Sequence, residues 1–507
     1  MGSEDQSGLF SGLSEVKAPE AASRGLPRLR TPIRNQIGVH WLTLDELLPP
    51  DHRARQVWSL VEQLDLSALY QAIKATEGRP GHPPGDPRLL VALWLYATLE
   101  QVGSARLLDR LCREHLAFRW MCGAVRVNYH TLSDFRVAHP AILEDLLTRS
   151  FAGCLESGLA SLERVAQDGV RVRANAGAAS FRRRQRLEES RELARTELAR
   201  LRRELHADPG AGTRRQRAAR ERAVAEREAR VAAALRVVNS LADPPPKGAA
   251  RMPPPPGHEP QARPMEPPTA VQVADSWADH APEGTAEALP PQEPPRQEAN
   301  AQPMEPALAA PPKQATGKQP RASTTDAEAR VMKMADGGFR PAFNVQFATA
   351  TDSQLIAAVA IGNIGSDQGQ LVPMVAQLAE RYGQPPSEIL VDGGFTKLAD
   401  IETVSASGQT TVYAPVAKPR DPQRDPHAPL PSDTPKVAVW RGRMATPEAK
   451  AIYKHRAATA ECVNALARNR GLQRFLVRGL LKAKAVALWF ALAHNLARII
   501  SLRTATA

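Results

Sequence analysis

Residues 446–471 read TPEAKAIYKHRAATAECVNALARNRG, and the expected organisation of the whole chain follows from this stretch. Pro447 is tolerated in a first helical turn, Glu448 favours a helix start and Gly471 favours a helix end, so the stretch predicts one helix. At about 100° per residue, one side of this helix is polar and carries Tyr453, Arg456, Glu461, Asn464 and Arg468. The other side can pack on a core. Taken alone, the stretch is better explained as an ordinary surface helix with solvated charges.

Two further carboxylates upstream each end a β-like run. Asp168 lies in LERVAQDGV (162–170), and Asp392 lies in SEILVDGGF (387–395). Because Asp-Gly is a common hairpin-turn dipeptide, Asp168 can also be interpreted as a turn residue. The functional interpretation is a carboxylate exposed at a strand end, with Arg173 close by in the same segment.

The composition indicates a globular protein with a polyanionic partner. The 507 residues are 43% hydrophobic and carry a net charge of +12, which points to nucleic acid as the partner. The four cysteines show no CxxC spacing, so neither a zinc site nor a disulfide framework is expected. The sequence lacks a signal-peptide pattern and an apolar run of about 18 residues, so we expect a soluble, cytoplasmic protein without membrane contact.

Composition along the chain divides it into segments. We expect a flexible N-terminal segment over 1–39 and an all-helical domain over 40–155, with a buried central helix over 89–99. Helix caps are expected at Asp86, Ser104 and Ser133. An α/β core is expected to begin over 156–180 and to continue over 326–502, interrupted by an Arg-rich helical insertion (181–242) and a Pro-rich disordered linker (243–325).

The two inserted segments differ in character. Residues 181–240 contain 17 Arg against nine acidic residues, so they supply most of the net positive charge. A solvated helical hairpin is one interpretation, and an arm that follows DNA phosphates is the other. Residues 243–320 hold 21 of the 44 prolines, so no regular secondary structure is expected there.

The α/β core predicts a mixed sheet that can gather the acidic residues. Strands are expected over 341–350, 354–363, 387–395 and 410–416, with helices over 369–383 and 482–502. If the strands of Asp168 and Asp392 are neighbours, the two aspartates lie side by side, and the helix of residues 446–471 adds Glu461. Three such carboxylates repel, and two Mg²⁺ ions would offset their charge. Paired ions of this kind promote phosphodiester cleavage and transfer.

The chain resembles the bacterial insertion-sequence transposases of the DDE type, with a ribonuclease-H-like catalytic core, in the subgroup with a tyrosine–arginine–glutamate motif. The matching pieces are VAQDGVRVRANAG (165–177), PAFNVQFA (341–348), LVDGGF (390–395) and YKHRAATAECVNALARNRGL (453–472). DPRLLVALWLYATLE (86–100) and NYHTLSDFR (128–136) resemble the helical domain that commonly precedes this core. Each motif alone is weak, but their order and spacing together are specific.

The resemblance implies that Asp168, Asp392 and Glu461 are the catalytic residues and hold two Mg²⁺ ions, for which Mn²⁺ can substitute. It implies that Tyr453, Arg456 and Arg468 hold DNA phosphates. The family usually has lysine at the position of Arg468. The spacing from the tyrosine to the glutamate is also one residue longer here than in some relatives.

The resemblance also implies DNA as the partner, namely the terminal inverted repeats of the element and the target DNA, with a dimer or larger assembly on DNA. Within the helical domain the candidate DNA contacts are Arg126, Asn128, His130 and Arg136, although a capped helix start explains this segment equally well. Arg173 is a further candidate DNA contact.

Three functions compete at this point. The first is an active transposase that cleaves the element's ends and transfers the 3′-hydroxyl strand. The second is a nuclease that only hydrolyses DNA with the same carboxylates. The third is a DNA-binding protein without chemistry, in which the acids are turn and surface residues.

Overall fold

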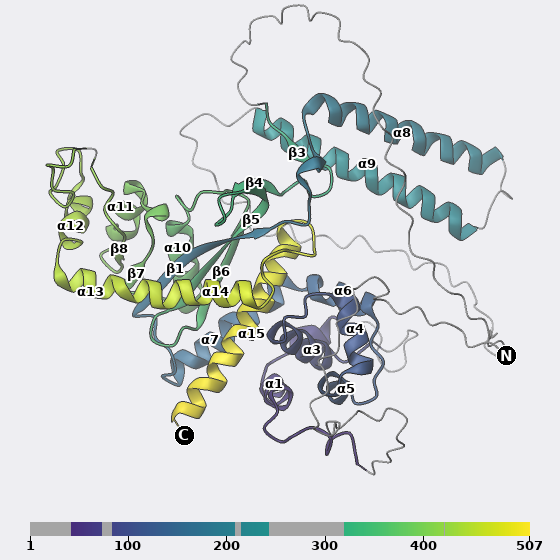
Figure 1. Cartoon of the computed structure of the whole chain (residues 1–507), viewed down its shortest axis with the longest axis horizontal. Coiled ribbons are helices and arrows are strands. Elements are labelled where there is room, and N and C mark those ends of the chain that lie inside the picture. The colour runs from purple at the N-terminus through teal and green to yellow at the C-terminus, as the bar shows by residue number, and fades with distance from the viewer. Residues whose placement is uncertain (1–41, 74–83, 208–213, 243–318, 420, 507) are drawn as a thin grey trace, which may run out of the picture. The chain divides into compact units, whose positions relative to one another are not determined.

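A computed structural model describes residues 42–73, 84–207, 214–242, 319–419 and 421–506 (Figure 1). The segment 1–39 and the proline-rich stretch up to 318 lie outside the described residues. The chain divides into two units, Met1–Pro49 and Pro50–Ala507. In the first unit, the described residues form turns in which Glu46 accepts hydrogen bonds from the backbone and the side chain of Thr43.

Helices fill the first part of the second unit, as expected. They are α1 (Arg53–Glu62), α2 (Ser67–Gln71), α3 (Pro87–Leu99), α4 (Ala105–Glu114), α5 (Leu116–Cys122), α6 (Tyr129–Ala138) and α7 (Pro140–Glu156). Helix α3 is the buried central helix, because eleven of its thirteen residues are buried. Its apolar residues surround the helix on all sides, so neighbouring helices must cover it.

Two of the three expected helix caps are confirmed, and one is wrong. The Asp86 side chain accepts a hydrogen bond from Arg88 N at the start of α3, and Ser104 accepts one from Leu107 N at the start of α4. Ser133 lies inside α6. The residue that caps α6 is Asn128, which accepts a hydrogen bond from Thr131 N at 2.9 Å. Asn128 has the same capping chemistry and stands earlier, so the helix starts one turn sooner.

The main sheet has six strands and is mixed. Its strands are β1 (Arg164–Arg173), β4 (Arg330–Lys333), β5 (Phe339–Ala350), β6 (Ile356–Gly362), β7 (Glu388–Leu390) and β8 (Thr411–Tyr413). The order is β4-β5-β1-β7-β8, and β6 also pairs with β5. The pairs β6–β5, β4–β5 and β5–β1 are antiparallel, whereas β1–β7 and β7–β8 are parallel. We expected the strand that contains Asp168 to lie beside the strand that leads to Asp392. The pairing of β1 with β7 confirms this.

Both faces of the sheet are covered. Val165 packs in one apolar cluster with Phe151 of α7 and Met374 of α10 (Leu371–Tyr382). Its neighbour Ala166 packs in another cluster with Trp440 of α12 (Pro435–Arg443), and α11 (Leu398–Ala406) contributes to the same cluster. Because successive strand residues point to opposite faces, the two clusters lie on opposite sides of the sheet.

Helix α15 (Leu480–Thr506) joins the helical region to the sheet (Figure 1). Its Asn495 side chain bonds both the N–H and the carbonyl of Ile356 in β6, each at 2.8 Å, and Trp489 Nε1 donates to Arg136 O in α6. By length and composition, the part over Leu480–Thr504 could cross a membrane, but 67% of its most apolar window is buried inside the protein. Its contacts with α3, α6, α7 and β6 make it a core helix.

The Arg-rich insertion forms a helical hairpin of α8 (Arg184–Ala207) and α9 (Arg214–Ala242), which pack along each other (Figure 1). Leu187 of α8 and Val231 of α9 meet in a small apolar cluster. At its base, β2 (Phe181–Arg182) pairs antiparallel with β3 (Ala322–Ser323). The last residues of the expected linker (243–325) therefore include a short strand, and this pairing returns the chain to the point where the insertion began.

The buried His494 predicts a specific pH dependence of stability. Its Nε2 donates to Gln354 O at 2.8 Å, and burial lowers the pKa of His494 to about 4 from 6.5. The folded state therefore resists protonation, and this contribution to stability is present above pH 6.5 and is lost as pH falls towards 4. Between pH 6.5 and pH 4, His494 should lower the free energy of unfolding of the wild type by about 3 kcal/mol, at about 1.4 kcal/mol per pKa unit. We expect His494→Gln to lack this decrease. Thermal unfolding of both proteins from pH 7 to pH 4 measures this difference. Parallel pH profiles would contradict the assignment.

Candidate active site

The stretch 446–471 is helical but not one regular α-helix. Thr446 caps α13 (Pro447–Arg456), a π-helical turn follows over Ala457–Glu461, and α14 (Cys462–Asn469) completes the stretch before Gly471, whose φ of +85° ends it. In an α-helix, residues five apart point about 140° away from each other. In a π-turn the hydrogen bonds run from i to i+5, so such residues lie about one turn apart. The π-turn therefore places Arg456 and Glu461 on the same side.

This π-turn also gives a physical account of the longer tyrosine-to-glutamate spacing. One additional residue in a regular helix would rotate Glu461 by about 100° relative to Tyr453 and Arg456. A π-turn absorbs an additional residue locally. Arg456 Nη1 lies 3.1 Å from Glu461 Oε1 as a result.

The expectation that Asp168 ends its strand or sits in a turn is wrong. It lies in the middle of β1, which pairs with β5 over its whole length, Asp168 standing opposite Phe347. β7 is much shorter, and its last residue paired with β1 is Leu390, opposite Ala166. Continuing this parallel register by two residues places Asp392 beside Asp168. Because β7 ends before this position, the Asp168 carboxylate faces Asp392 and the 446–471 stretch, and its side chain is 14% exposed.

The three acidic residues meet at one guanidinium, that of Arg456. Its Nη2 lies 3.5 Å from Asp168 Oδ2 and 3.6 Å from Asp392 Oδ2, and its Nη1 contacts Glu461. The Arg456 side chain is only 11% exposed, whereas that of Glu461 is 63% exposed. Arg456 is therefore an internal counter-ion for residues that stand 224 and 69 positions apart in the sequence. The Glu461 side chain is thus open to solvent, and the Arg456 guanidinium is largely enclosed.

Burial and charge shift the pKa values of the site. Burial raises the pKa of Asp168 to about 6, Arg456 opposes this shift, and the neighbouring Asp392 adds to it. Burial disfavours the charged form of Arg456, but Asp168 and the other nearby acids raise its pKa. Burial also raises the pKa of Tyr453, whose hydroxyl donates to Val391 O at 3.2 Å. Tyr453 therefore fastens α13 to the segment that carries Asp392.

Two residues that contact or surround the acids were not assigned to the site from the sequence. Asn464 of α14 donates from Nδ2 to Asp168 Oδ2 at 3.0 Å. Asp367, in the loop after β6, accepts hydrogen bonds at Oδ1 from Asn344 and Gln346 of β5, each at 2.7 Å. The polar face of the 446–471 helix included Asn464 and could have identified it. No sequence pattern pointed to Asp367, because its loop comes to lie beside β1 only when the sheet forms.

Gly169 makes this arrangement possible. A Cβ at this position would lie 2.4 Å from Gln346 Nε2, 2.5 Å from Asp367 Oδ1 and 2.9 Å from Asn344 Oδ1. The Asp-Gly dipeptide favours a turn when only the sequence is considered, but Gly169 is a strand residue that leaves space for a buried polar network. A glycine inside a strand commonly marks such a close approach.

The donor chemistry of the site fits divalent cations. Asp168, Asp392 and Glu461 offer only oxygen atoms, which Mg²⁺ prefers. In addition, Oδ1 of Asn464 is buried and has no hydrogen-bond partner among the described residues. In this conformation, however, no group of three or more His, Cys, Asp or Glu side chains in the described ranges is arranged to hold a metal ion. The Arg456 guanidinium lies among the carboxylates, so a cation would have to replace it there.

The other candidate DNA contacts lie away from the acids. Arg468 is exposed at the end of α14 and lines a pocket together with Arg474. Arg173 is exposed at the end of β1, where its backbone pairs with that of Gln473 and Phe475. Arg126 and His130 are exposed at the start of α6, beside the capping residue Asn128.

The expectation that Arg136 contacts DNA is not supported by its environment. Its guanidinium lies 4.6 Å from the centre of the Trp94 ring and donates from Nη1 to Gly103 O. Burial lowers the pKa of Arg136 to about 10. Arg136 therefore ties α6 to the central helix α3, and we do not propose it as a DNA contact.

Comparison with known protein families gives two matches. Residues 42–138 match a family described as transposase domain (DUF772), and residues 431–500 match a family described as transposase DDE domain. The second match contains Arg456 and Glu461. No curated protein and no solved structure matches the chain. The two family matches, in this order along the chain, support a DNA transposase and therefore an enzyme that acts on DNA.

The close packing around Gly169 predicts that even a methyl group is costly there. We expect Gly169→Ala to lower the free energy of unfolding by about 1–3 kcal/mol, because the buried network of Asn344, Gln346 and Asp367 must break or shift. Gly177→Ala is the matched control, since nothing lies within 4 Å of a Cβ at that position. Thermal unfolding measures both. A Gly169→Ala protein as stable as the control would show that the network yields without cost.

Proposed function

We propose that this chain is an insertion-sequence transposase of the DDE type, with Asp168, Asp392 and Glu461 as the catalytic residues. The observation that carries the proposal is the meeting of these three carboxylates at the single guanidinium of Arg456. Residues this distant in sequence meet only because β1 and β7 are parallel neighbours and the π-turn directs Glu461 towards them. Surface acids without a shared role have no reason to converge in this way.

We further propose that the core is ribonuclease-H-like and belongs to the tyrosine–arginine–glutamate subgroup. The support for the core is a sheet with three successive antiparallel strands, β6, β5 and β1, extended by the parallel strands β7 and β8. The support for the subgroup is Tyr453, which fastens α13 beside Asp392, together with Arg456 and Glu461 on the same helical stretch.

Asp168, Asp392 and Glu461 would hold two Mg²⁺ ions, with Mn²⁺ as a substitute. Such ions activate a water or a 3′-hydroxyl and stabilise the leaving oxygen of a phosphodiester. The chain's own residues prepare this site. Asn464 holds the Asp168 carboxylate, Tyr453 fixes the backbone before Asp392, and Arg456 balances the acids until its guanidinium turns to a DNA phosphate.

The proposed partners are the terminal inverted repeats and the target DNA, contacted by Arg468, Arg173, Arg126, Asn128 and His130. These residues are exposed and belong to the helical region, to β1 and to α14. Because two element ends must be joined, we propose a dimer or a larger assembly on DNA. A nuclease that only hydrolyses DNA would use the same carboxylates, so strand joining is the reaction that distinguishes the two.

Neutral variants of the acids test the catalytic assignment. We expect Asp392→Asn and Glu461→Gln each to abolish Mg²⁺-dependent strand joining and to leave DNA affinity unchanged or raised, because they remove cation ligands and negative charge. The assay uses the purified protein, the DNA that flanks its own gene, and Mg²⁺ or chelator. Glu448→Gln, an exposed acid on the same helix, is the control and should join DNA normally. If either acid variant still joins DNA strands, the assignment of that residue as catalytic is wrong.

Removal of the internal counter-ion tests whether a cation takes its place. We expect Arg456→Gln to destabilise the metal-free protein by about 3 kcal/mol, because a partly buried charge cluster loses its partner. Added Mg²⁺ should then raise the melting temperature of the variant more than that of the wild type, because the cation no longer competes with Arg456. Thermal unfolding with and without Mg²⁺ measures both effects. Equal Mg²⁺ shifts in the two proteins would place the cation elsewhere.

A further inference from the structure

A pocket of about 350 Å³ lies at the base of the α8–α9 hairpin, outside the site of the three acids. We call it the hairpin-base pocket. Four of its eight lining residues are arginines that come from three separate parts of the chain, and three more carry hydroxyl groups. The lining residues are Arg182, Arg227, Arg230, Arg478, Ser190, Thr324, Thr325 and Val231.

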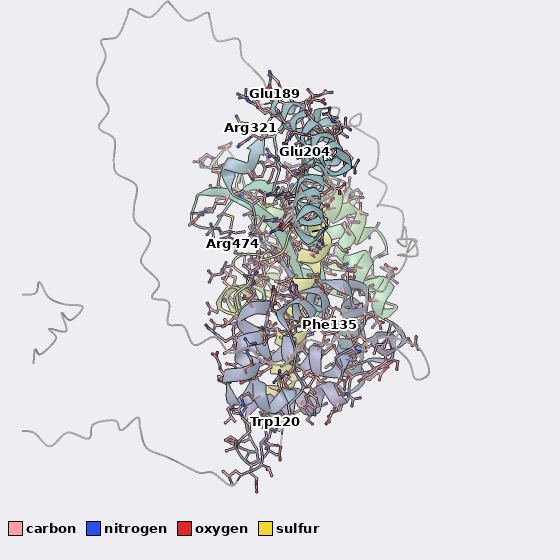
Figure 2. The ribbon with its side chains drawn as sticks, turned by 90° about the vertical axis from the view of Figure 1, so that its right-hand side faces the viewer. Trp120, Phe135, Glu189, Glu204, Arg321 and Arg474 are labelled. Carbon is pink, nitrogen blue, oxygen red and sulfur yellow. The ribbon has the colours of Figure 1, made fainter. Side chains whose placement is uncertain are left out.

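The hairpin-base pocket differs from the rest of the hairpin in its charge balance. Along the two helices, arginines are neutralised by glutamates within the hairpin, in the pairs Arg184–Glu188, Arg186–Glu189, Arg191–Glu228, Arg200–Glu204 and Arg202–Glu221. Glu189 and Glu204 are among the side chains drawn on these helices in Figure 2. These five arginines each have an acidic partner on the two helices.

In the pocket, by contrast, the lining contains no acidic residue. Arg182 donates to the backbone carbonyls of Ala179 and Phe181, and Arg230 has a 3.7 Å contact with Glu226. Within the part of the chain that the structure describes, Arg227 and Arg478 have no acidic partner. Cations gathered in this way repel, and an anion is the group that offsets the repulsion.

The chemistry of the lining selects phosphate. Guanidinium groups present planar forks of donors that match phosphate oxygens, and the hydroxyls of Ser190, Thr324 and Thr325 can donate as well. The pocket has few apolar groups, of which Val231 is the single aliphatic side chain in the lining. An organic ligand with a large apolar body would find little to pack against.

Backbone hydrogen bonds connect the segment that carries Arg478 of the hairpin-base pocket to the strand that carries Asp168. Arg478 follows a segment in which Phe475 N donates to Arg173 O at 2.8 Å, at the end of the strand that carries Asp168. Asp326 Oδ2 accepts from Gly479 N, so both sides of Arg478 are held. Along β1, Arg173 lies roughly 17 Å from Asp168, which is less than one DNA turn of about 34 Å. A duplex that contacts the acids can therefore also reach the Arg173 end of β1, to which the segment of Arg478 is hydrogen-bonded.

We propose that the hairpin-base pocket binds a backbone phosphate of the DNA on which the three acids act. This inference rests on the proposed function. It differs from the alternative of an arm that follows phosphates along its whole length, because it assigns the contact to the arginines that converge at the base of the hairpin. The insertion then serves to complete an anchoring point for DNA outside the site of the three acids.

The test uses the full-length protein with Arg227→Ala and Arg478→Ala combined, and a 30-base-pair duplex of arbitrary sequence. We expect the slope of log K against log salt concentration to become less steep by about 1 for each phosphate that the variant no longer neutralises. At low salt the affinity should fall about tenfold, as for the removal of one charge-assisted hydrogen bond. An unchanged slope would overturn the proposal.

Two matched variants exclude trivial explanations. Arg184→Ala with Arg186→Ala removes two hairpin arginines that are paired with Glu188 and Glu189, and its salt slope should equal that of the wild type. The conservative double change of Arg227→Lys and Arg478→Lys keeps both charges and should restore the slope, whereas a misfolded protein would not be rescued. If the slope of the Arg184→Ala, Arg186→Ala control falls by the same amount, the effect is one of net charge and the pocket proposal is wrong.

Two further measurements separate this inference from the function on which it rests. Asp392→Asn should lose strand joining and keep the wild-type salt slope. If it does so while the arginine variant also keeps that slope, the transposase assignment stands and the pocket proposal fails. Inorganic phosphate at constant ionic strength should compete with DNA for the wild type only. Phosphate that binds the wild type without displacing DNA would mean that the pocket takes free phosphate and not DNA.

Discussion

The structure of the site depends on one electrostatic arrangement, in which Arg456 lies among Asp168, Asp392 and Glu461. Three carboxylates held this near to each other would repel in the absence of a cation. A guanidinium supplies that cation from within the chain and lets the sheet and the helical stretch close before any ligand arrives. A cation that binds the three carboxylates therefore competes with the Arg456 guanidinium and must displace it.

The surroundings of Arg456 explain why the site is rigid on one side and adjustable on the other. Asp168 is fixed by β1, by Asn464 and by the space that Gly169 leaves for the network of Asp367. Glu461, in contrast, is mostly exposed and stands at the end of a π-turn, an element frequently found at functional sites. A cation or a DNA strand can therefore draw Glu461 and Arg456 into new positions without disturbing the sheet.

Among its described residues, the α8–α9 hairpin also combines arginines with and without acidic partners. The hairpin carries many arginines, and glutamates on the same two helices pair with several of them. Four guanidinium groups converge in a pocket without acidic lining at the hairpin base, where the insertion leaves and rejoins the core. A long insertion is tolerated at this point because the pair β2–β3 closes it, so the core can keep its register on either side.

The sequence by itself determined the elements whose signals are local. The apolar residues of α3 with its Asp86 cap, the strands β5 and β6, and the helix starts at Thr446 and Pro447 could all be predicted, because periodicity and capping act within a few residues. The acids could be selected from motif order. Only the tertiary structure decided that Asp168 lies in mid-strand, that a π-turn redirects Glu461 and that Asp367 stands beside Gly169. These features depend on the length of a neighbouring strand and on contacts between distant segments, and local sequence does not encode either.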